Sequence, residues 1–165
     1  MNKILAGAAS GFAATAPMTA AMLVMHRMLP AHQRYALPPR KVTMNVARTL
    51  GIKHKMDRGE EDAATIAAHF GYGTAMGGIY SMFADEVPVP RVASGIGWGF
   101  IVWAASYLGL LPGLDLHESA KDHPPERNIL MILAHIVWGA TLGVMMEGRE
   151  RGRMSKWAGR LRHFQ

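Results

Sequence analysis

The chain has 165 residues, of which 50% are hydrophobic and only 18% are charged, and it contains 18 glycines and 13 methionines. Its formal net charge is +6, and it has no cysteine. The absence of cysteine excludes disulfides, iron–sulfur clusters and thiolate zinc sites, so any metal would need histidine or carboxylate ligands. This composition suits a small multi-span membrane protein better than a soluble domain.

Four stretches lack Lys, Arg, Asp and Glu over roughly the 20 residues that a helix needs to cross a bilayer. They lie near residues 4–25, 63–84, 92–114 and 128–146. The sequence therefore predicts an all-helical, four-span membrane bundle over residues 1–147, followed by a tail over residues 148–165.

The first stretch has some features of a secretory signal. Lys3 precedes it, and the small residues 14–16 are typical of a cleavage site. However, Pro17 follows directly and the apolar run continues to Met25. We therefore expect a retained span.

The connection after the first span predicts a short helix. A Pro-Pro pair at residue 38 marks its start, Gly51 marks its end, and one helical face carries Val42, Val46 and Leu50. This pattern is typical of an amphipathic helix lying on the membrane.

The connections on either side of the second span also carry signals. Acidic residues within 57–62 stand where that span begins, as the helix dipole favours. Pro88 and Pro90 predict a short, stiff turn after it. We expect this turn to make the second and third spans antiparallel neighbours.

Each predicted span contains two glycines four residues apart. The pairs are Gly7 and Gly11, Gly73 and Gly77, Gly95 and Gly99, and Gly139 and Gly143. Small residues let helix backbones approach closely in lipid, where there is little hydrophobic drive between helices. We expect the pairs to pack helices within the bundle and, where a face stays unused, to bind a partner helix or a second copy.

Two segments share one skeleton. Residues 68–77 read AHFGYGTAMG and residues 134–143 read AHIVWGATLG, while 93–100, ASGIGWGF, echoes 9–16, ASGFAATA. The pattern indicates a two-helix hairpin duplicated in tandem, with the copies related by a twofold axis along the membrane normal. His69 and His135 would then occupy equivalent positions.

Three interpretations of His69 and His135 stay open. Each ring could hydrogen-bond a carbonyl or hydroxyl group and so hold the helices in register. The pair could instead act as a protonation switch inside the membrane. It could also ligate one haem b between facing helices. We expect no cofactor, with haem b as the alternative.

The segment before the last span brings several potential metal ligands into a short interval. They are Asp115, His117, Glu118, Asp122, His123 and Glu126. These side chains could bind zinc or another divalent ion. Their spacing matches no established signature, and a helix cap or a solvated rim accounts for them as well, so we predict no metal site. No catalytic centre stands out, and we predict that the chain is not an enzyme.

The tail over residues 148–165 is strongly basic, with apolar residues recurring at steps of three and four. Its expected membrane-interface residues are Arg149, Arg151, Arg153, Lys156, Trp157, Arg160 and Arg162. The pattern predicts an interfacial helix facing anionic lipid headgroups rather than a nucleic-acid arm. A cytoplasmic tail would place both termini inside a bacterial cell.

Three stretches together resemble the YagU-like group of small bacterial inner-membrane proteins. They are LPPRKVT at 37–43, AHFGYG at 68–73 and AHIVWG at 134–139. The resemblance covers most of residues 4–147 and implies an inner-membrane location. The group is linked to acid tolerance, which would suit protonation of His69 and His135.

We therefore expect a non-catalytic accessory or interaction subunit of a bacterial inner-membrane complex. Its partners would be the lipid bilayer and other membrane subunits or a second copy, with no nucleic acid. The glycine faces and four aromatic residues would supply the surfaces for partner helices: Trp98, Trp103, Tyr107 and Trp138. The alternative is a bundle that carries haem or protons through His69 and His135.

Overall fold

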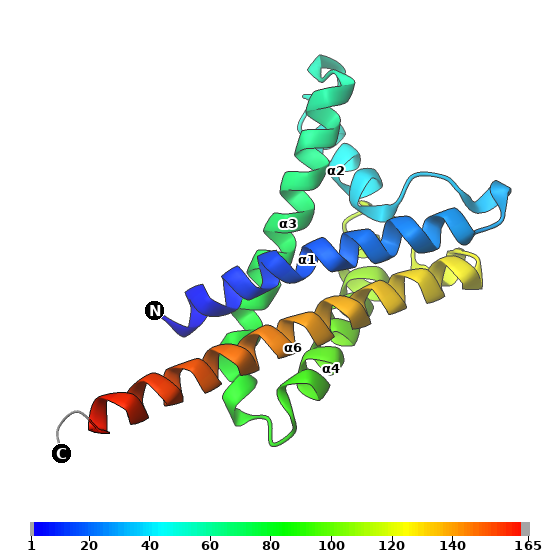
Figure 1. The fold of residues 1–165 in the computed structure, drawn as a ribbon. Helices are drawn as coiled ribbons and strands as arrows, with labels where there is room; N and C mark the ends of the chain where they lie inside the picture. Colours follow the sequence, from blue (N-terminus) through cyan, green and yellow to red (C-terminus); the bar gives the residue numbers. More distant parts are fainter. Residues whose placement is uncertain (1, 163–165) are drawn as a thin grey trace.

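A computed structural model describes the backbone of residues 2–162 and the side chains of residues 2–149. All regular structure in this part of the chain is helical (Figure 1), which confirms the all-α prediction. The long helices are α1 (Lys3–Met28), α3 (Arg58–Phe83), α4 (Arg91–Ala105) and α6 (Pro125–Arg162). The short ones are α2 (Pro38–Thr49), a π-helical turn η4 (Ser106–Leu110), α5 (Leu111–Gly113), and the 3-10 turns η1 (Ala31–Gln33), η2 (Lys53–Lys55), η3 (Ala84–Glu86) and η5 (Ala120–Asp122).

Three helical segments are long and apolar enough to cross a membrane. They are α1, the continuous segment Arg91–Gly113, and α6 over Pro125–Arg149, and they match three of the four predicted spans. Helix α3 has 26 residues, but its first turns are charged and its middle is rich in glycine and alanine. Its crossing of a membrane therefore stays a prediction.

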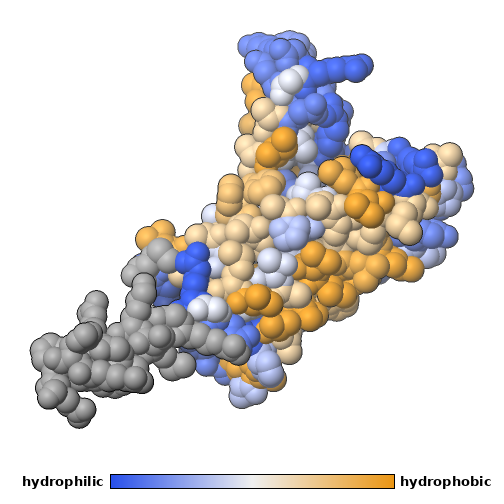
Figure 2. Space-filling model, viewed as in Figure 1, coloured by the Kyte–Doolittle hydropathy of each residue, from blue (hydrophilic) through white to orange (hydrophobic). Residues whose placement is uncertain are grey.

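The surface supports a membrane location for the bundle. Apolar residues cover its flanks, while hydrophilic residues gather at the free end of α3 and on the connecting loops (Figure 2). Large apolar side chains on this surface include Leu5, Phe12, Leu23, Val24, Ile79, Met82, Phe100, Ile101, Leu133 and Val144. Lipid would cover such a surface, whereas in water it would promote aggregation.

Local capping signals set the ends of two helices. Asp57 caps α3, because its Oδ1 accepts a hydrogen bond from the Glu60 backbone N–H at 2.8 Å, while the Glu60 carboxylate accepts one from the Asp57 N–H at 2.9 Å. Helix α2 begins at Pro38, and Gly51 follows it with a φ of 69°, which few residues other than glycine adopt without strain.

Helix α2 packs onto the protein through a face other than its predicted membrane-facing one. Met44 and Ala47 point into the protein, whereas Val46 and Leu50 are exposed. The regular spacing of Val42, Val46 and Leu50 identified a helix correctly, and α3 packs against another side of it. Contact of the exposed Val46 and Leu50 with the membrane stays a prediction.

The long helices pack as two pairs. Helix α1 packs against α3, α4 packs against α6, and α1 and α6 join the pairs. The predicted glycines lie at both pair contacts: a Cβ on Gly77 would lie 2.7 Å from the Gly11 Cα, and one on Gly143 would lie 2.7 Å from the Val92 Cα. Only glycine lets the backbones approach this closely.

Helices α3 and α4 contact each other little, although the turn between them is short. The two helices are thus neighbours joined by a turn and by side-chain contacts, but their backbones do not pack closely. They diverge from the turn, and long side chains bridge the space: Trp98 Nε1 donates to the Met76 carbonyl at 3.0 Å, and the Tyr72 and Ser106 hydroxyl groups lie 2.8 Å apart. The reason is that α3 follows the glycine face of α1.

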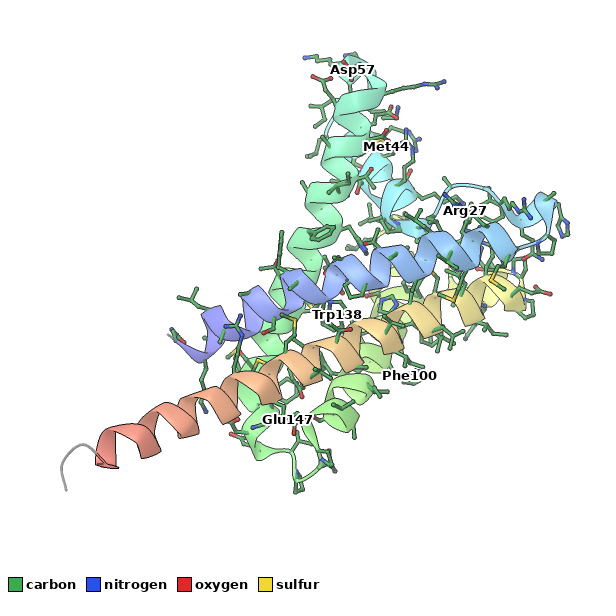
Figure 3. All side chains as sticks on the ribbon, in the orientation of Figure 1. Arg27, Met44, Asp57, Phe100, Trp138 and Glu147 are labelled. Carbon is green, nitrogen blue, oxygen red and sulfur yellow. The ribbon has the colours of Figure 1, made fainter. Side chains whose placement is uncertain are left out.

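The predicted surfaces for partner helices are largely internal. Trp103, Tyr107 and Trp138 are buried and Trp98 is half-buried. Trp138 lies between α6 and α1 (Figure 3), where its Nε1 donates to the Gly11 carbonyl at 3.2 Å. The prediction that these aromatic residues face partner helices is wrong, because the bundle uses them for its own core.

Helix α6 runs past residue 147 to Arg162 without a break in its backbone. Arg149 is exposed. The other predicted interface residues, Arg151, Arg153, Lys156, Trp157, Arg160 and Arg162, lie outside the residues whose side chains are described. Their contact with lipid stays a prediction.

Candidate functional site

A cavity of about 260 Å³ lies where α3 diverges from α4. Helices α1, α2, α3 and α6 and the π-helical turn η4 all contribute to its walls. Most of the lining side chains are apolar, among them Met18, Val42, Met76, Val102 and Leu111. The cavity therefore lies at the meeting point of the two helix pairs and is partly open to the surface.

Both predicted histidines line this cavity, His69 from α3 and His135 from α6. The His135 Nδ1 lies 2.8 Å from the Met131 carbonyl, so it donates a hydrogen bond and leaves Nε2 as an acceptor. The His69 Nε2 is buried and has no hydrogen-bond partner among the described residues. The structure thus brings the two rings to one cavity and leaves each with unused hydrogen-bonding capacity.

Two tyrosines that the sequence did not single out for chemistry complete the polar lining. Tyr72 bridges α3 to Ser106 in η4. The Tyr107 ring meets the His135 ring edge to face, with centroids 6.0 Å apart, and meets the His117 ring at 5.8 Å. Tyr107 and Ser106 both lie in the π-helical turn, a local feature often found at functional sites.

The cavity as it stands is small for a haem. Pockets for drug-sized ligands typically measure about 300–1,000 Å³, and the cavity at about 260 Å³ falls below this range. A porphyrin macrocycle is larger than most drug-sized molecules. The two histidines could hold a haem only if the helices moved apart.

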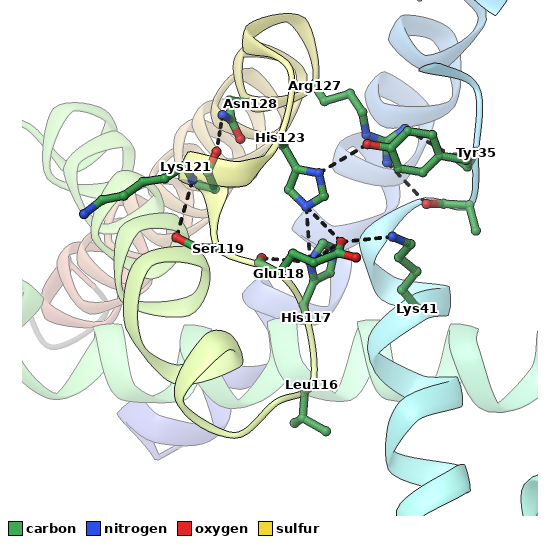
Figure 4. Close-up of polar contacts among 12 residues, drawn as sticks. Tyr35, Lys41, Leu116, His117, Glu118, Ser119, Lys121, His123, Arg127 and Asn128 are labelled. Carbon is green, nitrogen blue, oxygen red and sulfur yellow. Dashed lines mark hydrogen bonds and ion pairs between the residues drawn. The ribbon is translucent and has the colours of Figure 1, made fainter. Parts of the chain in front are cut away.

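A second polar cluster lies on the connection between α5 and α6 (Figure 4). It contains His117, Glu118 and His123, whose ligand atoms all lie within 4.8 Å of one another. Burial lowers the pKa of both histidines, so the rings are neutral at neutral pH. The hydrogen bond from Lys41 lowers the pKa of Glu118, which keeps it ionised.

Two residues outside the predicted site support this cluster. The Tyr35 hydroxyl lies 3.2 Å from the His123 Nδ1, and the Arg127 guanidinium stacks over the Tyr35 ring at 3.6 Å from its centroid. Arg127 also donates hydrogen bonds to the carbonyls of Gln33, Tyr35 and Ala36. No local pattern could reveal Arg127, because its partners lie about 90 residues away in the chain.

The other potential ligands of this interval stay apart from the cluster. The group that could hold a metal ion does not include Asp115, Asp122 or Glu126. Glu126 instead accepts a hydrogen bond from the Gln33 side chain at 3.3 Å. Three of the six candidate ligands in this interval thus converge.

Fold and site together define an all-helical membrane protein with a cavity lined by histidines. The chain belongs to the family described as "Protein of unknown function (DUF1440)", which matches residues 18–144. This region includes both cavity histidines and the loop cluster, and the basic tail lies outside it. No curated protein and no solved structure matches the chain.

Proposed function

We propose that this membrane protein binds a small, largely apolar molecule in the cavity between its two helix pairs. The observation that carries the proposal is the convergence of His69 and His135 on one cavity whose other walls are mostly apolar. An apolar cavity with a few convergent polar groups is the usual form of a small-molecule site.

The lining indicates the chemistry of the ligand. The His135 Nε2 is a hydrogen-bond acceptor, because Nδ1 donates to Met131. A ligand with a hydroxyl or N–H group on a compact apolar body would satisfy it. An engineered apolar cavity of about 150 Å³ holds benzene, so a cavity of about 260 Å³ has room for a substituted aromatic ring.

Phenol and benzene are the probes that test this proposal on the purified full chain in mild detergent. We expect both to bind, with phenol favoured about fivefold, since one hydrogen bond contributes about 1 kcal/mol. His135→Leu should abolish the preference for phenol, and Val42→Trp, which fills the cavity, should abolish binding of both. His54→Ala is the control, because His54 is exposed and outside the cavity. Equal binding by the wild type and Val42→Trp would refute the proposal.

Proton transfer is a second candidate function, and the unpartnered His69 Nε2 is the observation that favours it. An ionisable side chain within a membrane is a functional-site hypothesis by default. The link to acid tolerance that the YagU-like resemblance implies would suit this role. The test is acid-driven proton uptake into vesicles, which His69→Gln and His135→Gln should each slow. Uptake that is indifferent to both substitutions would dismiss it.

An accessory role in a larger bacterial inner-membrane complex also stays a proposal. The glycine pairs and the large aromatic residues were the surfaces expected to contact partner helices. They support this role less than expected, because they pack inside the bundle. The remaining support is the basic tail. Deleting residues 148–165 should release the chain from its complex and leave the bundle folded, and co-purification that survives the deletion would count against the tail as a docking segment.

We further propose that the two helix pairs are copies of one ancestral hairpin. Gly11 packs against the glycine pair of α3, and Gly95, its counterpart in the sequence echo, packs against the glycine pair of α6. The equivalent positions thus make equivalent contacts. A twofold relation would make the contact between α1 and α6 equivalent to the contact between α4 and α3. These two contacts differ, because α1 packs closely on α6 while α4 and α3 diverge to form the cavity.

We also propose that α3 is a fourth crossing and that both termini lie in the cytoplasm. Lys3 forms an ion pair with Asp85, so the start of α1 lies beside the turn after α3. Because the chain has no cysteine, single cysteines at His54 and Val89 can be labelled with a membrane-impermeant reagent. Labelling from opposite sides supports the crossing, and labelling from one side refutes it.

A further inference from the structure

The loop cluster of His117, Glu118 and His123 shares no residue with the cavity lining, although the Tyr107 ring contacts both His117 and His135. It combines two imidazoles with one carboxylate on a connection outside the membrane-spanning segments. We propose that these three side chains bind one divalent transition-metal ion, with Zn²⁺ the best match to the ligand set.

The distances between the ligand atoms fit a tetrahedral ion. Metal–ligand bonds of about 2.0–2.1 Å in a tetrahedron place neighbouring ligand atoms about 3.3 Å apart. The His117 Nδ1 and His123 Nε2 are 3.3 Å apart, the His123 Nε2 and a Glu118 oxygen 3.5 Å, and the His117 Nδ1 and the same oxygen 3.9 Å. The three atoms therefore form one face of such a tetrahedron with only small adjustment.

The second nitrogen of His123 is held as in known metal sites. A metal-binding histidine usually directs its other ring nitrogen to an oxygen, which orients the ring. The His123 Nδ1 meets the Tyr35 hydroxyl at 3.2 Å, and Arg127 stacked over the Tyr35 ring holds that side chain in place.

The metal-free arrangement shows what the ion must displace. The His117 Nδ1 lies 3.0 Å from the Glu118 backbone carbonyl, so binding moves the ring proton to Nε2. The Lys41 ammonium lies 3.1 Å from the Glu118 carboxylate and must turn away. Its side chain is 32% exposed, which gives it room to do so. Removing this cation should therefore strengthen metal binding.

The ligand set also suggests a class of metal site. Two imidazoles favour zinc and similar ions over Mg²⁺ and Ca²⁺, which prefer oxygen ligands alone. Structural zinc sites use four protein ligands, whereas catalytic sites use three and keep a position for water. His117 and Glu118 also line an open polar cleft of about 640 Å³, from which water could reach the ion.

The test is a titration of the chelator-treated full chain in detergent with Co²⁺, followed by competition with Zn²⁺. The protein should carry no histidine tag. We expect one Co²⁺ per chain, with the intense visible absorption of a tetrahedral ion that Zn²⁺ then removes. His123→Ala should weaken binding at least 100-fold, and His54→Ala, outside the cluster, should leave it unchanged.

Two conservative variants keep the test decisive if an alanine variant fails to fold. Tyr35→Phe keeps the ring beneath Arg127 but loses the hydroxyl, and it should weaken binding about tenfold. Lys41→Met should tighten it about tenfold by freeing Glu118. Weak binding that none of these substitutions changes would mark the ion as adventitious and overturn the proposal, and this result would leave the cavity proposal untouched.

Discussion

Substituting two adjacent glycines of α3 by alanine should have opposite effects on stability. A Cβ on Gly77 would lie 2.7 Å from the Gly11 Cα and 2.9 Å from the Gly11 N, whereas ordinary contacts begin near 3.4 Å. The nearest atom is the Gly7 carbonyl oxygen, at 2.5 Å. Because these atoms are backbone, α1 as a whole must move by about 0.9 Å to restore an ordinary contact. Overpacking of this kind costs about 1–3 kcal/mol, and alanine recovers up to about 1 kcal/mol in helix propensity. We expect Gly77→Ala to destabilise the bundle by about 1–2 kcal/mol.

The matched control is Gly78→Ala. A Cβ there would meet the Ile4 Cγ2 at 3.6 Å and the Ala8 Cβ at 3.8 Å, which are ordinary contacts. This variant should keep the propensity gain of about 1 kcal/mol. The two variants should then differ by about 5–10 °C in Tm, because 1 kcal/mol corresponds to about 2–4 °C in a chain of this size.

Thermal unfolding in mild detergent, followed by tryptophan fluorescence, measures this difference directly. The chain has four tryptophans. One of them, Trp138, donates a hydrogen bond to the carbonyl of Gly11, which lies in the contact between α1 and α3. If Gly77→Ala proved as stable as Gly78→Ala, the close approach of α1 and α3 would be refuted.

Three further predictions concern the connections. Arg127→Met should lower the free energy of unfolding by about 3 kcal/mol, since it leaves the Gln33 and Ala36 carbonyls without a donor and leaves the Tyr35 carbonyl with His26 Nε2 alone, at 3.1 Å; a loss below 1 kcal/mol in denaturant unfolding would contradict this. Asp57→Ala should cost about 1 kcal/mol and increase amide exchange in the first turn of α3, and unchanged exchange there would show that the cap is dispensable. The hydrogen bond from Lys53, aided by the Arg40 charge, lowers the pKa of Glu61 from its ordinary 4.5. The ion pair of Glu61 therefore stabilises the folded state fully at pH values above 4.5. This stabilisation is lost as the pH falls through the lower pKa that Glu61 has in the folded protein. Unfolding midpoints from pH 6 to pH 3 should fall less steeply in Glu61→Gln than in the wild type, and parallel curves would exclude the ion pair as a source of the slope.

Local chemistry made the helix ends predictable. The acidic run at 57–62 caps α3 through Asp57 and Glu60, the prolines at 38 and 39 begin α2, and Gly51 follows its end. Each signal acts over a few residues, so the sequence alone contains the whole cause. The same holds for the uncharged stretches that became α1, the 91–113 segment and the first part of α6.

The sequence was less informative about which faces meet. It identified the glycine pairs and the repeated histidines, but not that α1 rather than α4 would be the partner of α3. It also assigned Trp103, Tyr107 and Trp138 to partner surfaces, although they are buried. An apolar face has the same pattern whether lipid, a partner or the rest of the chain covers it, so periodicity cannot decide between them.

The sequence by itself determined that this protein is all-helical, where several of its helices begin, and that charges are excluded from four long segments. These properties follow from backbone capping and from hydropathy, which depend on neighbouring residues. Only the tertiary structure brought His69 and His135 to one cavity and brought three of the six candidate ligands together in the loop cluster. It also brought the Arg127 side chain of α6 into contact with the connection after α1. These juxtapositions depend on how closely the glycine faces let the helices approach and where the helices then diverge.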